Sequence, residues 1–354
     1  MAYVARPFDE ARDRDALLAL WGATLSDRSL NAKLEERYRW LYASARERRL
    51  RTFLVVDDTT DTVIGCSSLV PHAVSVDGEL RPAGIGVDLA IAQGHRVAGP
   101  AVVLQRAVVD AVARGELGPG AFCFAYPNDG ALPVVKRVGY RVVGKTSHAV
   151  KPVRTAYKLA PRLPSPHLVR PLAKVGDLAL ALLDRGRLLR APVLHNALVV
   201  VRPDERFDAL FDRMRRELPV LGDRRAAFLD WRYAQCPTRE HVIVGATTRS
   251  GRELLGYAIV ALEGSTAILV DQLAVSPAAT VATFTHLAGE LRARGLDSIF
   301  ASFLGNETLS SSLRASGFFD RGADRSMVLY APPGAPAPLA EAARWQIFDG
   351  ELDL

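Results

Sequence analysis

The first 150 residues alternate between short apolar runs and segments whose apolar positions recur at helical spacing. In the stretch 86–112, an apolar run with one embedded acid, Val87 to Ala92, leads through the turn Gln93–His95 into an apolar-striped helix. A second strand-like run covers residues 122–126, and a last strand is expected to begin at Arg141. The pattern predicts an α/β (α+β) unit in which helices flank a mixed sheet.

The second half of the chain repeats the order of the first. Matched segments are offset by 191 residues at the two tryptophans, and the offset shrinks only slightly toward the C-terminus. Five ordered matches indicate a duplication followed by changes in loop length, so each half is expected to form a similar, mostly antiparallel, twisted sheet flanked by helices. The matched pairs are Trp40–Tyr42 with Trp231–Tyr233, Ile64-Gly65 with Leu255-Gly256, Val87–Ile91 with Val270–Val275, Ala113–Gly115 with Ala293–Gly295, and Gly139-Tyr140 with Gly317-Phe318.

A proline-rich segment separates the halves. Its five prolines between residues 152 and 171 exclude a long helix there, and apolar residues at helical spacing then predict a connecting helix from Leu172 to Leu189. The apolar face of that helix is expected to pack on the domains, with docking on a membrane surface as the alternative. The predicted parts are a first domain at 1–150, the linker and helix at 151–194, a second domain at 195–332 and a tail at 333–354, whose carboxylates Asp349, Glu351 and Asp353 are expected to be solvated.

Composition and charge narrow the class of protein. The 354 residues are 49% hydrophobic with a net charge of +6, and no apolar run approaches the ~20 residues of a membrane span. Nine Lys and Arg residues but only two acids lie in 151–190, which fits a solvated connector or a contact with nucleic acid, anionic lipid or a phosphorylated substrate. The first residues lack a signal-peptide pattern. Isolated Cys66, Cys123 and Cys236 predict reduced thiols in a cytoplasmic protein, and no cluster has metal-ligand spacing.

Small residues at the turn after the Val87–Ala92 run indicate anion binding. Arg96 is followed by Gly99 and Ala101 in the pattern R-x-x-G-x-A, and Pro100 suits a first helical turn, where N–H groups lack intrahelical partners. Such N–H groups can approach an anion closely, and the helix N-terminus favours negative charge. The chain has neither G-x-G-x-x-G nor G-K-[ST], so this loop is neither a dinucleotide fingerprint nor a P-loop.

The loop resembles the acyl-CoA loop of GNAT-type N-acyltransferases, which reads Gln/Arg-x-x-Gly-x-Gly/Ala after a strand. A second feature of that family, Asn128 with Ala131 three residues on and Gly139-Tyr140 before the last strand, occurs in the family order and at the family spacing. The resemblance implies two tandem GNAT-like domains and a cofactor that is acetyl-CoA or another acyl-CoA. No metal site is expected, because no His, Cys or Asp cluster of the sequence has metal-ligand spacing.

The resemblance also implies roles for individual residues. Backbone N–H groups of the strand 89–91 would polarise a thioester carbonyl, and the amides of 97–101 together with Arg96 would hold a diphosphate. Asn128 matches a position near the pantetheine arm. The implied cofactor-binding residues are Leu89, Ala90, Ile91, Arg96, Val97, Ala98, Gly99, Ala101 and Asn128.

Asp88 is the candidate catalytic base or amine-orienting carboxylate. A charge inside an otherwise apolar strand is costly unless something requires it. The alternative is a structural role, either a hydrogen bond to a turn or an ion pair with an arginine, and the recurrence of an acid at Asp271 in the second repeat favours it. Val135 stands where the family often has a tyrosine general acid, so the usual proton donor is missing.

The two repeats differ at the anion-binding turn. Residues 276–282 contain neither a glycine nor a cation, so the first repeat is expected to hold the cofactor and the second to supply substrate walls. The segments Phe228–Tyr233 and Trp345–Leu354 are similar to parts of tandem GNAT proteins linked to surface-polysaccharide or amino-sugar modification, and the tandem arrangement resembles Fem-like transferases. Substrate class inferred in this way is an analogy.

These observations predict an N-acyltransferase, with acetyl as the expected acyl group, that acts on the amine of a small molecule or amino sugar. Two alternatives remain open. One is a Fem-like aminoacyl transferase that uses aminoacyl-tRNA and contacts it through the basic segment 151–190. The other is a non-catalytic protein that binds CoA or a nucleotide-sugar. We expect no nucleic-acid partner under the leading interpretation, and the assembly could be a homodimer.

Overall fold

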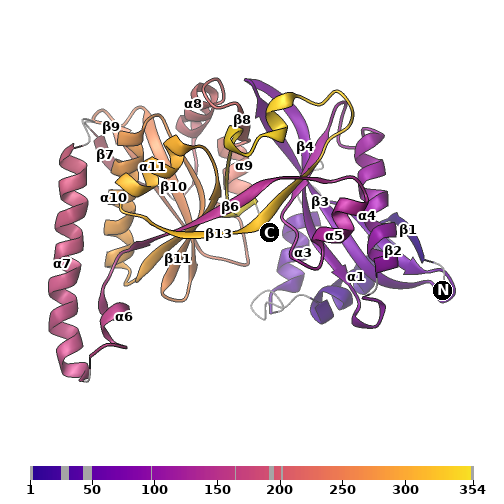
Figure 1. The fold of residues 1–354 in the computed structure, drawn as a ribbon, viewed down its shortest axis with the longest axis horizontal. Coiled ribbons are helices and arrows are strands. Elements are labelled where there is room, and N and C mark those ends of the chain that lie inside the picture. The colour runs from indigo at the N-terminus through magenta and orange to yellow at the C-terminus, as the bar shows by residue number, and fades with distance from the viewer. Residues whose placement is uncertain are drawn as a thin grey trace.

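A computed structural model shows two similar halves joined through one continuous sheet (Figure 1). It describes residues 3–24, 32–42, 50–96, 98–163, 165–190, 195–200 and 202–351.

The N-terminal half follows the predicted order. The run Val87–Ala92 forms the end of a long strand and the residue after it, the turn Gln93–His95 is a short 3-10 helix, and the apolar-striped helix follows. The elements are β1 (Tyr3–Pro7), α1 (Glu10–Thr24), α3 (Leu34–Tyr42), β2 (Arg51–Asp57), β3 (Thr62–Val76), β4 (Glu79–Ile91), η1 (Gln93–His95), α4 (Ala98–Ala113), β5 (Phe122–Ala125), α5 (Leu132–Arg137) and β6 (Arg141–Pro152).

The C-terminal half has matching elements and a tail. Polar caps start its helices: Ser276 accepts from the amide of Ala279, and Asn306 accepts from that of Leu309. The elements are α6 (Ala156–Leu159), α7 (Pro166–Arg190), β7 (His195–Val200), α8 (Glu205–Met214), β8 (Val220–Gly222), α9 (Ala226–Leu229), η2 (Asp230–Ala234), β9 (His241–Thr248), β10 (Leu254–Glu263), β11 (Thr266–Ala274), α10 (Pro277–Ala293), β12 (Ser298–Leu304), α11 (Glu307–Ala315), β13 (Phe319–Tyr330), η3 (Ala337–Ala340), η4 (Ala342–Arg344), β14 (Trp345–Phe348) and η5 (Asp349–Glu351).

The strand order confirms the duplication. It runs β1-β2-β3-β4-β5-β13-β6-β12-β11-β10-β9-β7, so reading from either end meets the corresponding strands of the two halves in the same sequence. In both halves the fourth and fifth strands are parallel, β4 with β5 and β11 with β12, while the strands before them are antiparallel. The fold is therefore the predicted pair of mixed, mostly antiparallel units.

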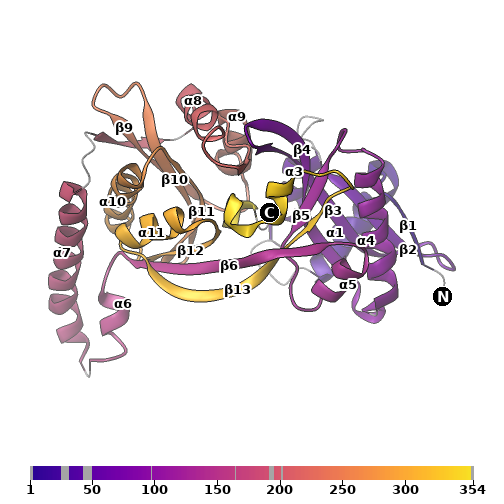
Figure 2. The same ribbon diagram turned by 45° about the horizontal axis from the view of Figure 1, so that its top comes forward.

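The last strand of each half is exchanged. Arg141 begins a strand as predicted, but β6 pairs with β12 and β13, while β13 closes the first unit by pairing with β5. β6 and β13 lie side by side between the two halves in both views (Figures 1 and 2). Residue 150, the expected end of the first domain, lies inside β6, and in space each sheet is completed by the last strand of the other half.

The duplicated tryptophans meet at the centre of the molecule. Trp40 Nε1 donates to the carbonyl of Trp231 at 3.0 Å, and the two ring centroids are 5.4 Å apart. Trp345 of the tail packs between the halves, with its ring 5.3 Å from that of Phe124. One buried apolar cluster accordingly contains residues of both halves, so they form one packed body.

The connecting helix is longer than predicted. α7 begins at Pro166, six residues before the expected start, because a proline lacks only an N–H that the first helical turn would leave unpaired. Pro171 lies inside this helix, so the expectation that the prolines exclude a long helix as far as residue 171 is wrong. Across the part of the chain that the structure describes, no helix combines the length and apolar character needed to cross a membrane.

His241, at the start of β9, is predicted to make stability depend on pH. Burial, with the nearby charges of Arg232 and Arg239, lowers its pKa from 6.5 to about 3. Between these values the unfolded chain binds the proton and the folded chain does not, so stability rises with pH across this window, by at most ~1.4 kcal/mol per pH unit. Urea unfolding of His241→Gln from pH 4 to 7 should show a flatter profile. His167→Gln, at an exposed histidine, is the control substitution.

Candidate active site

The site lies where β4 and β5 separate. The two strands pair in parallel from Ala83 with Phe122 to Gly86 with Ala125, and then β5 ends while β4 continues to Ile91. A cavity of about 300 Å³ opens there between the strands, α4 and the segment after β5. Its lining includes Ser67, Val87, Asp88, Leu89, Gln105, Tyr126, Asn128, Tyr140 and Arg325. Separated parallel strands leave room for an extended ligand to enter the sheet.

A β-bulge shapes the β4 side of the cavity. Cys66 pairs with Ala90 and Ser68 with Val87, so two residues of β4, Asp88 and Leu89, face one residue of β3. Asp88 has a φ of 55°, which costs a non-glycine residue about 1–2 kcal/mol. Because a bulge interrupts the ladder, it re-aims backbone groups that a regular strand would pair.

Asp88 is held by an arginine that sequence reasoning missed. Both of its carboxylate oxygens accept from Nη2 of Arg37, at 2.7 and 3.0 Å, and the two side chains are almost fully buried. Arg37 also lies over the ring of Trp21, 4.4 Å from its centroid. The ion pair that the sequence left as the structural alternative is therefore present. Asp271 is anchored in the same way, by Nε of Arg224 at 2.8 Å.

The remaining predicted residues divide into two groups. Leu89 and Asn128 line the cavity with Asp88, and Asn128 fixes its own turn because its Oδ1 accepts from the amide of Ala131 at 2.9 Å. Ala90 and Ile91 continue β4 beyond it. Arg96 and the first turn of α4, with Ala98, Gly99 and Ala101, lie next along the chain and do not line this cavity. Val97 falls outside the described residues.

Arg96 and Gly99 are both exposed at the start of α4. Arg96 donates from Nε to the carbonyl of Ile91 at 3.1 Å, which ties the turn to the end of β4. At Gly99 an added Cβ would meet only ring carbons of Tyr3 at 4.0 Å, so the helix start is open to a ligand.

Comparison with solved structures identifies the architecture. A GCN5-related N-acetyltransferase from Anabaena variabilis matches with a TM-score of 0.63 and 12% identity, over 93% of this chain and 73% of that one. A tandem GNAT protein from the clavulanic acid biosynthesis pathway matches with a TM-score of 0.53 and 11% identity, over 93% and 98%. The fold is that of a tandem GNAT protein.

A third solved structure with a similar fold is that of an enzyme with a long-chain acyl-CoA bound. N-myristoyltransferase of Saccharomyces cerevisiae, solved with bound myristoyl-CoA, has a TM-score of 0.56 and 10% identity over 93% of this chain and 80% of its own. No protein-family model and no curated protein matches the sequence. At these identities the likeness establishes the fold of the two GNAT-type units and leaves their chemistry to the residues of this chain.

Tyr126 lines the cavity of the first GNAT-type unit, and its buried hydroxyl lies near the carboxylates of Asp349 and Glu351 in the tail. Val135, at the usual tyrosine position, is buried in α5. Tyr140 lines the cavity too, but its hydroxyl lies 3.1 Å from Sγ of Cys123 and its ring packs against Tyr330. Within the described residues, the buried hydroxyl of Tyr126 has no hydrogen-bond partner. Burial raises the pKa of Tyr126 well above its ordinary value, so it keeps its proton at neutral pH.

In the second GNAT-type unit, the tail occupies the equivalent opening. β11 and β12 pair in parallel only as far as Leu269 with Ala301. Beyond that point β14 pairs with β12, Phe348 opposite Phe303, and Nε2 of Gln346 donates to the carbonyl of Gln272 at 3.1 Å. A cavity of about 250 Å³ remains beside Gln272 and Asn306. The expected difference between the repeats thus has a second physical basis, a strand in the opening.

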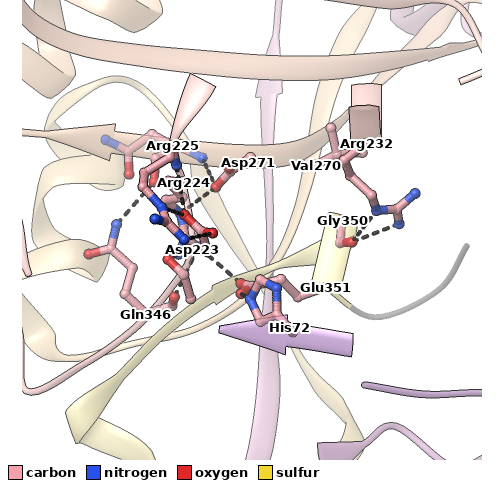
Figure 3. A network of polar contacts seen from close by, with 12 residues as sticks. His72, Asp223, Arg224, Arg225, Arg232, Val270, Asp271, Gln346, Gly350 and Glu351 are labelled. Atoms are coloured by element: carbon pink, nitrogen blue, oxygen red, sulfur yellow. Dashed lines mark hydrogen bonds and ion pairs between the residues drawn. The ribbon is translucent and has the colours of Figure 1, made fainter. Parts of the chain in front are cut away.

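The carboxylate of Glu351 is buried, which corrects the expectation that the tail acids are solvated. It accepts from Nη2 of Arg224 at 2.9 Å and lies 3.3 Å from Nε2 of His72 on β3 (Figure 3). Burial alone would raise the pKa of Glu351, but Arg224 and His72 outweigh burial and the pKa is lowered. Asp349 is half-buried, and Asp353 lies outside the described residues. The network ties the tail to both halves.

Proposed function

We propose that this chain is an acyl-CoA-dependent N-acyltransferase whose first GNAT-type unit carries the active site. The observation that carries the proposal is the asymmetry between the repeats. The β4–β5 opening is a cavity beside a helix start with a glycine and a cation, whereas the matching opening between β11 and β12 is partly occupied by β14 and its helix start has neither. An extended thioester needs such an opening in a sheet, and its diphosphate needs a helix N-terminus.

The residues present fit a CoA ester. The first turn of α4 supplies backbone N–H groups and the positive end of a helix dipole, and Arg96 adds a cation at its start. Leu89 and Asn128 lie on the two sides of the opening, where a pantetheine arm would pass. When bound, the ester supplies an activated acyl carbonyl and a thiolate leaving group. Acetyl is the acyl group we expect, and a longer chain would be a variation of the same site.

Asp88 is assigned a positioning role. Its carboxylate is occupied by Arg37, and its backbone forms the bulge, so the ion pair holds the bulge amides of β4 against the cavity. Preorganised backbone N–H groups of this kind stabilise charge that develops on a carbonyl oxygen. We propose that the acceptor is the amine of a small molecule or of an amino sugar. We also propose that the protein acts in the cytoplasm, because its three cysteines are free thiols.

Tyr126 is proposed as the proton donor. In N-acyl transfer a C–N bond forms, the C–S bond breaks, the amine loses a proton and the thiolate gains one. The phenol of Tyr126, which lines the cavity and has no other hydrogen-bond partner among the described residues, can supply the last of these. Tyr126→Phe should therefore lower kcat about a hundredfold and leave CoA affinity nearly unchanged.

Tyr140→Phe is the matched control, because that residue is also a buried tyrosine that lines the cavity. Its hydroxyl is paired with Cys123, so the variant should lose about 1 kcal/mol of stability and little activity. Both variants are compared by the rate of thiol release with an amine acceptor. Equal activity of Tyr126→Phe and the wild type would remove Tyr126 from the mechanism.

The function itself is tested by thermal shift with CoA, acetyl-CoA and tRNA, because a ligand that binds only the folded state raises Tm. Stabilisation by CoA, followed by thiol release when amines or amino sugars are added, supports the proposal. Stabilisation by CoA without release for any amine indicates a CoA-binding protein. Stabilisation by tRNA but not by CoA supports the aminoacyl-tRNA alternative.

A further inference from the structure

Helix α7 presents an apolar stripe to solvent. It lies along the edge of the molecule farthest from the N-terminal half, with its outer side uncovered in both views (Figures 1 and 2). Large aliphatic side chains recur at helical spacing along it, each between 46% and 81% exposed. They include Leu168, Leu172, Val175, Leu178, Leu182 and Leu189. A surface helix normally turns such a stripe inward, so this orientation is reversed.

The inner face of α7 is held by polar contacts. Buried Asp184 bonds Lys151 at 2.6 Å and also pairs with Arg187 and Arg292. Asp177 accepts from the backbone amide and hydroxyl of Thr155, at 2.7 and 2.9 Å. The helix is therefore fixed to the protein through both of its acids, while the leucines of the stripe stay exposed.

The exposed charge of α7 is entirely positive. Arg170, Lys174, Arg185 and Arg190 are exposed, while the two acids of the helix face the protein. At 100° per residue, the first three of these cations form a row along one edge of the apolar stripe. An apolar stripe with a basic edge matches a surface that is apolar inside and anionic outside.

A second copy of the chain fits this surface less well. In a two-fold dimer the same patch meets itself, so the cations of two copies of α7 would gather at one interface with no exposed acid of α7 to balance them. We propose that α7 docks the protein peripherally on an anionic lipid surface, lying in the plane of the interface with its stripe in the headgroup region. The helix, 25 residues and about 37 Å long, offers a contact along its whole length.

The test is flotation with vesicles of phosphatidylcholine, with and without phosphatidylglycerol. We expect the full chain to float with the anionic vesicles and to be released as salt is added. The stripe variant Val175→Gln/Leu178→Gln/Leu182→Gln should weaken partition into the vesicles by at least about tenfold. A tenfold change needs less free energy than the full burial of one leucine side chain supplies, and the variant removes three large apolar side chains. The edge variant Arg170→Gln/Lys174→Gln/Arg185→Gln should weaken partition by about fivefold per charge removed, on anionic vesicles only.

The matched control replaces exposed apolar residues elsewhere: Val4→Gln/Leu80→Gln/Phe319→Gln should float like the wild type. Tm is measured for every variant and should stay constant, because the substituted side chains are exposed. The proposal fails if the wild type does not float, or if the stripe variant floats as well as the control. It also fails if light scattering finds a dimer that the stripe variant dissociates while neither protein binds vesicles, because a second copy would then cover α7.

Discussion

Gly99→Glu should abolish CoA binding while leaving the fold intact. The substitution puts a carboxylate on the first turn of α4, where the diphosphate would lie. Two charges about 4 Å apart near a protein surface repel by roughly 4 kcal/mol, so we expect at least about a hundredfold loss of CoA affinity. In the absence of ligand, Tm should stay constant or rise, since an added Cβ meets nothing closer than 4.0 Å and glutamate suits a first helical turn better than glycine does.

The opposite effects on stability and binding make this test specific. Gly289→Glu in α10 is the control, because Gly289 is also an exposed helical glycine whose added Cβ would meet nothing within 4 Å. Thermal shift and isothermal calorimetry with CoA should separate the two variants. If Gly99→Glu binds CoA like the wild type, or if Gly289→Glu is the variant that loses binding, the first unit does not hold the cofactor.

Local features of the site could be predicted from the sequence. The strand, turn and helix at 86–112 could be predicted because the spacing of apolar residues within a short segment reflects its local structure. The duplication could be predicted from matched pairs of residues such as Gly139 and Gly317. Asp88, Leu89 and Asn128 then meet at one cavity because β4 and β5 are parallel in the folded sheet and separate at the same edge.

Features that depend on distant pairing could not be predicted. The strands after Gly139 and Gly317 carry equivalent signals, so nothing in either segment tells which half it closes, and the exchange of β6 and β13 follows only from the assembled sheet. Arg37 lies 51 residues from Asp88 on a different element, and one arginine among many gives no sign that its partner is buried.

The tail shows how a duplicated fold can specialise. Trp345–Phe348 has too few residues to identify a strand, yet as β14 it enters the opening between β11 and β12 and pairs with both β12 and β8. Because β8 also pairs with β3, the tail connects the unit that it fills to the unit that stays open. The second repeat thus differs from the first in two places, at the turn after β11, which has neither a glycine nor a cation, and at the opening beside it, which β14 enters.

Arg224→Met should be the most destabilising single substitution in this network. Arg224 donates to Asp271 at 2.8 Å and to Glu351 at 2.9 Å, and all three side chains are at most 7% exposed. Removing the guanidinium leaves the carboxylates of Asp271 and Glu351 buried without the cation that pairs with them. Breaking a buried ion pair in this way costs about 3–5 kcal/mol of stability. Urea unfolding at pH 7 should show at least that loss in the free energy of unfolding.

The neighbouring residue gives a close control. Arg225 pairs with Asp223 at 2.7 Å, but its side chain is 46% exposed, so Arg225→Met should cost no more than about 1 kcal/mol. The Arg224→Met deficit should shrink at acidic pH. Without the guanidinium, burial raises the pKa of Asp271 and Glu351 above the values in the unfolded chain, and the folded state then gains stability as protons bind. Equal losses in the two variants, or a deficit that grows as pH falls, would show that the tail is not held by this charge network.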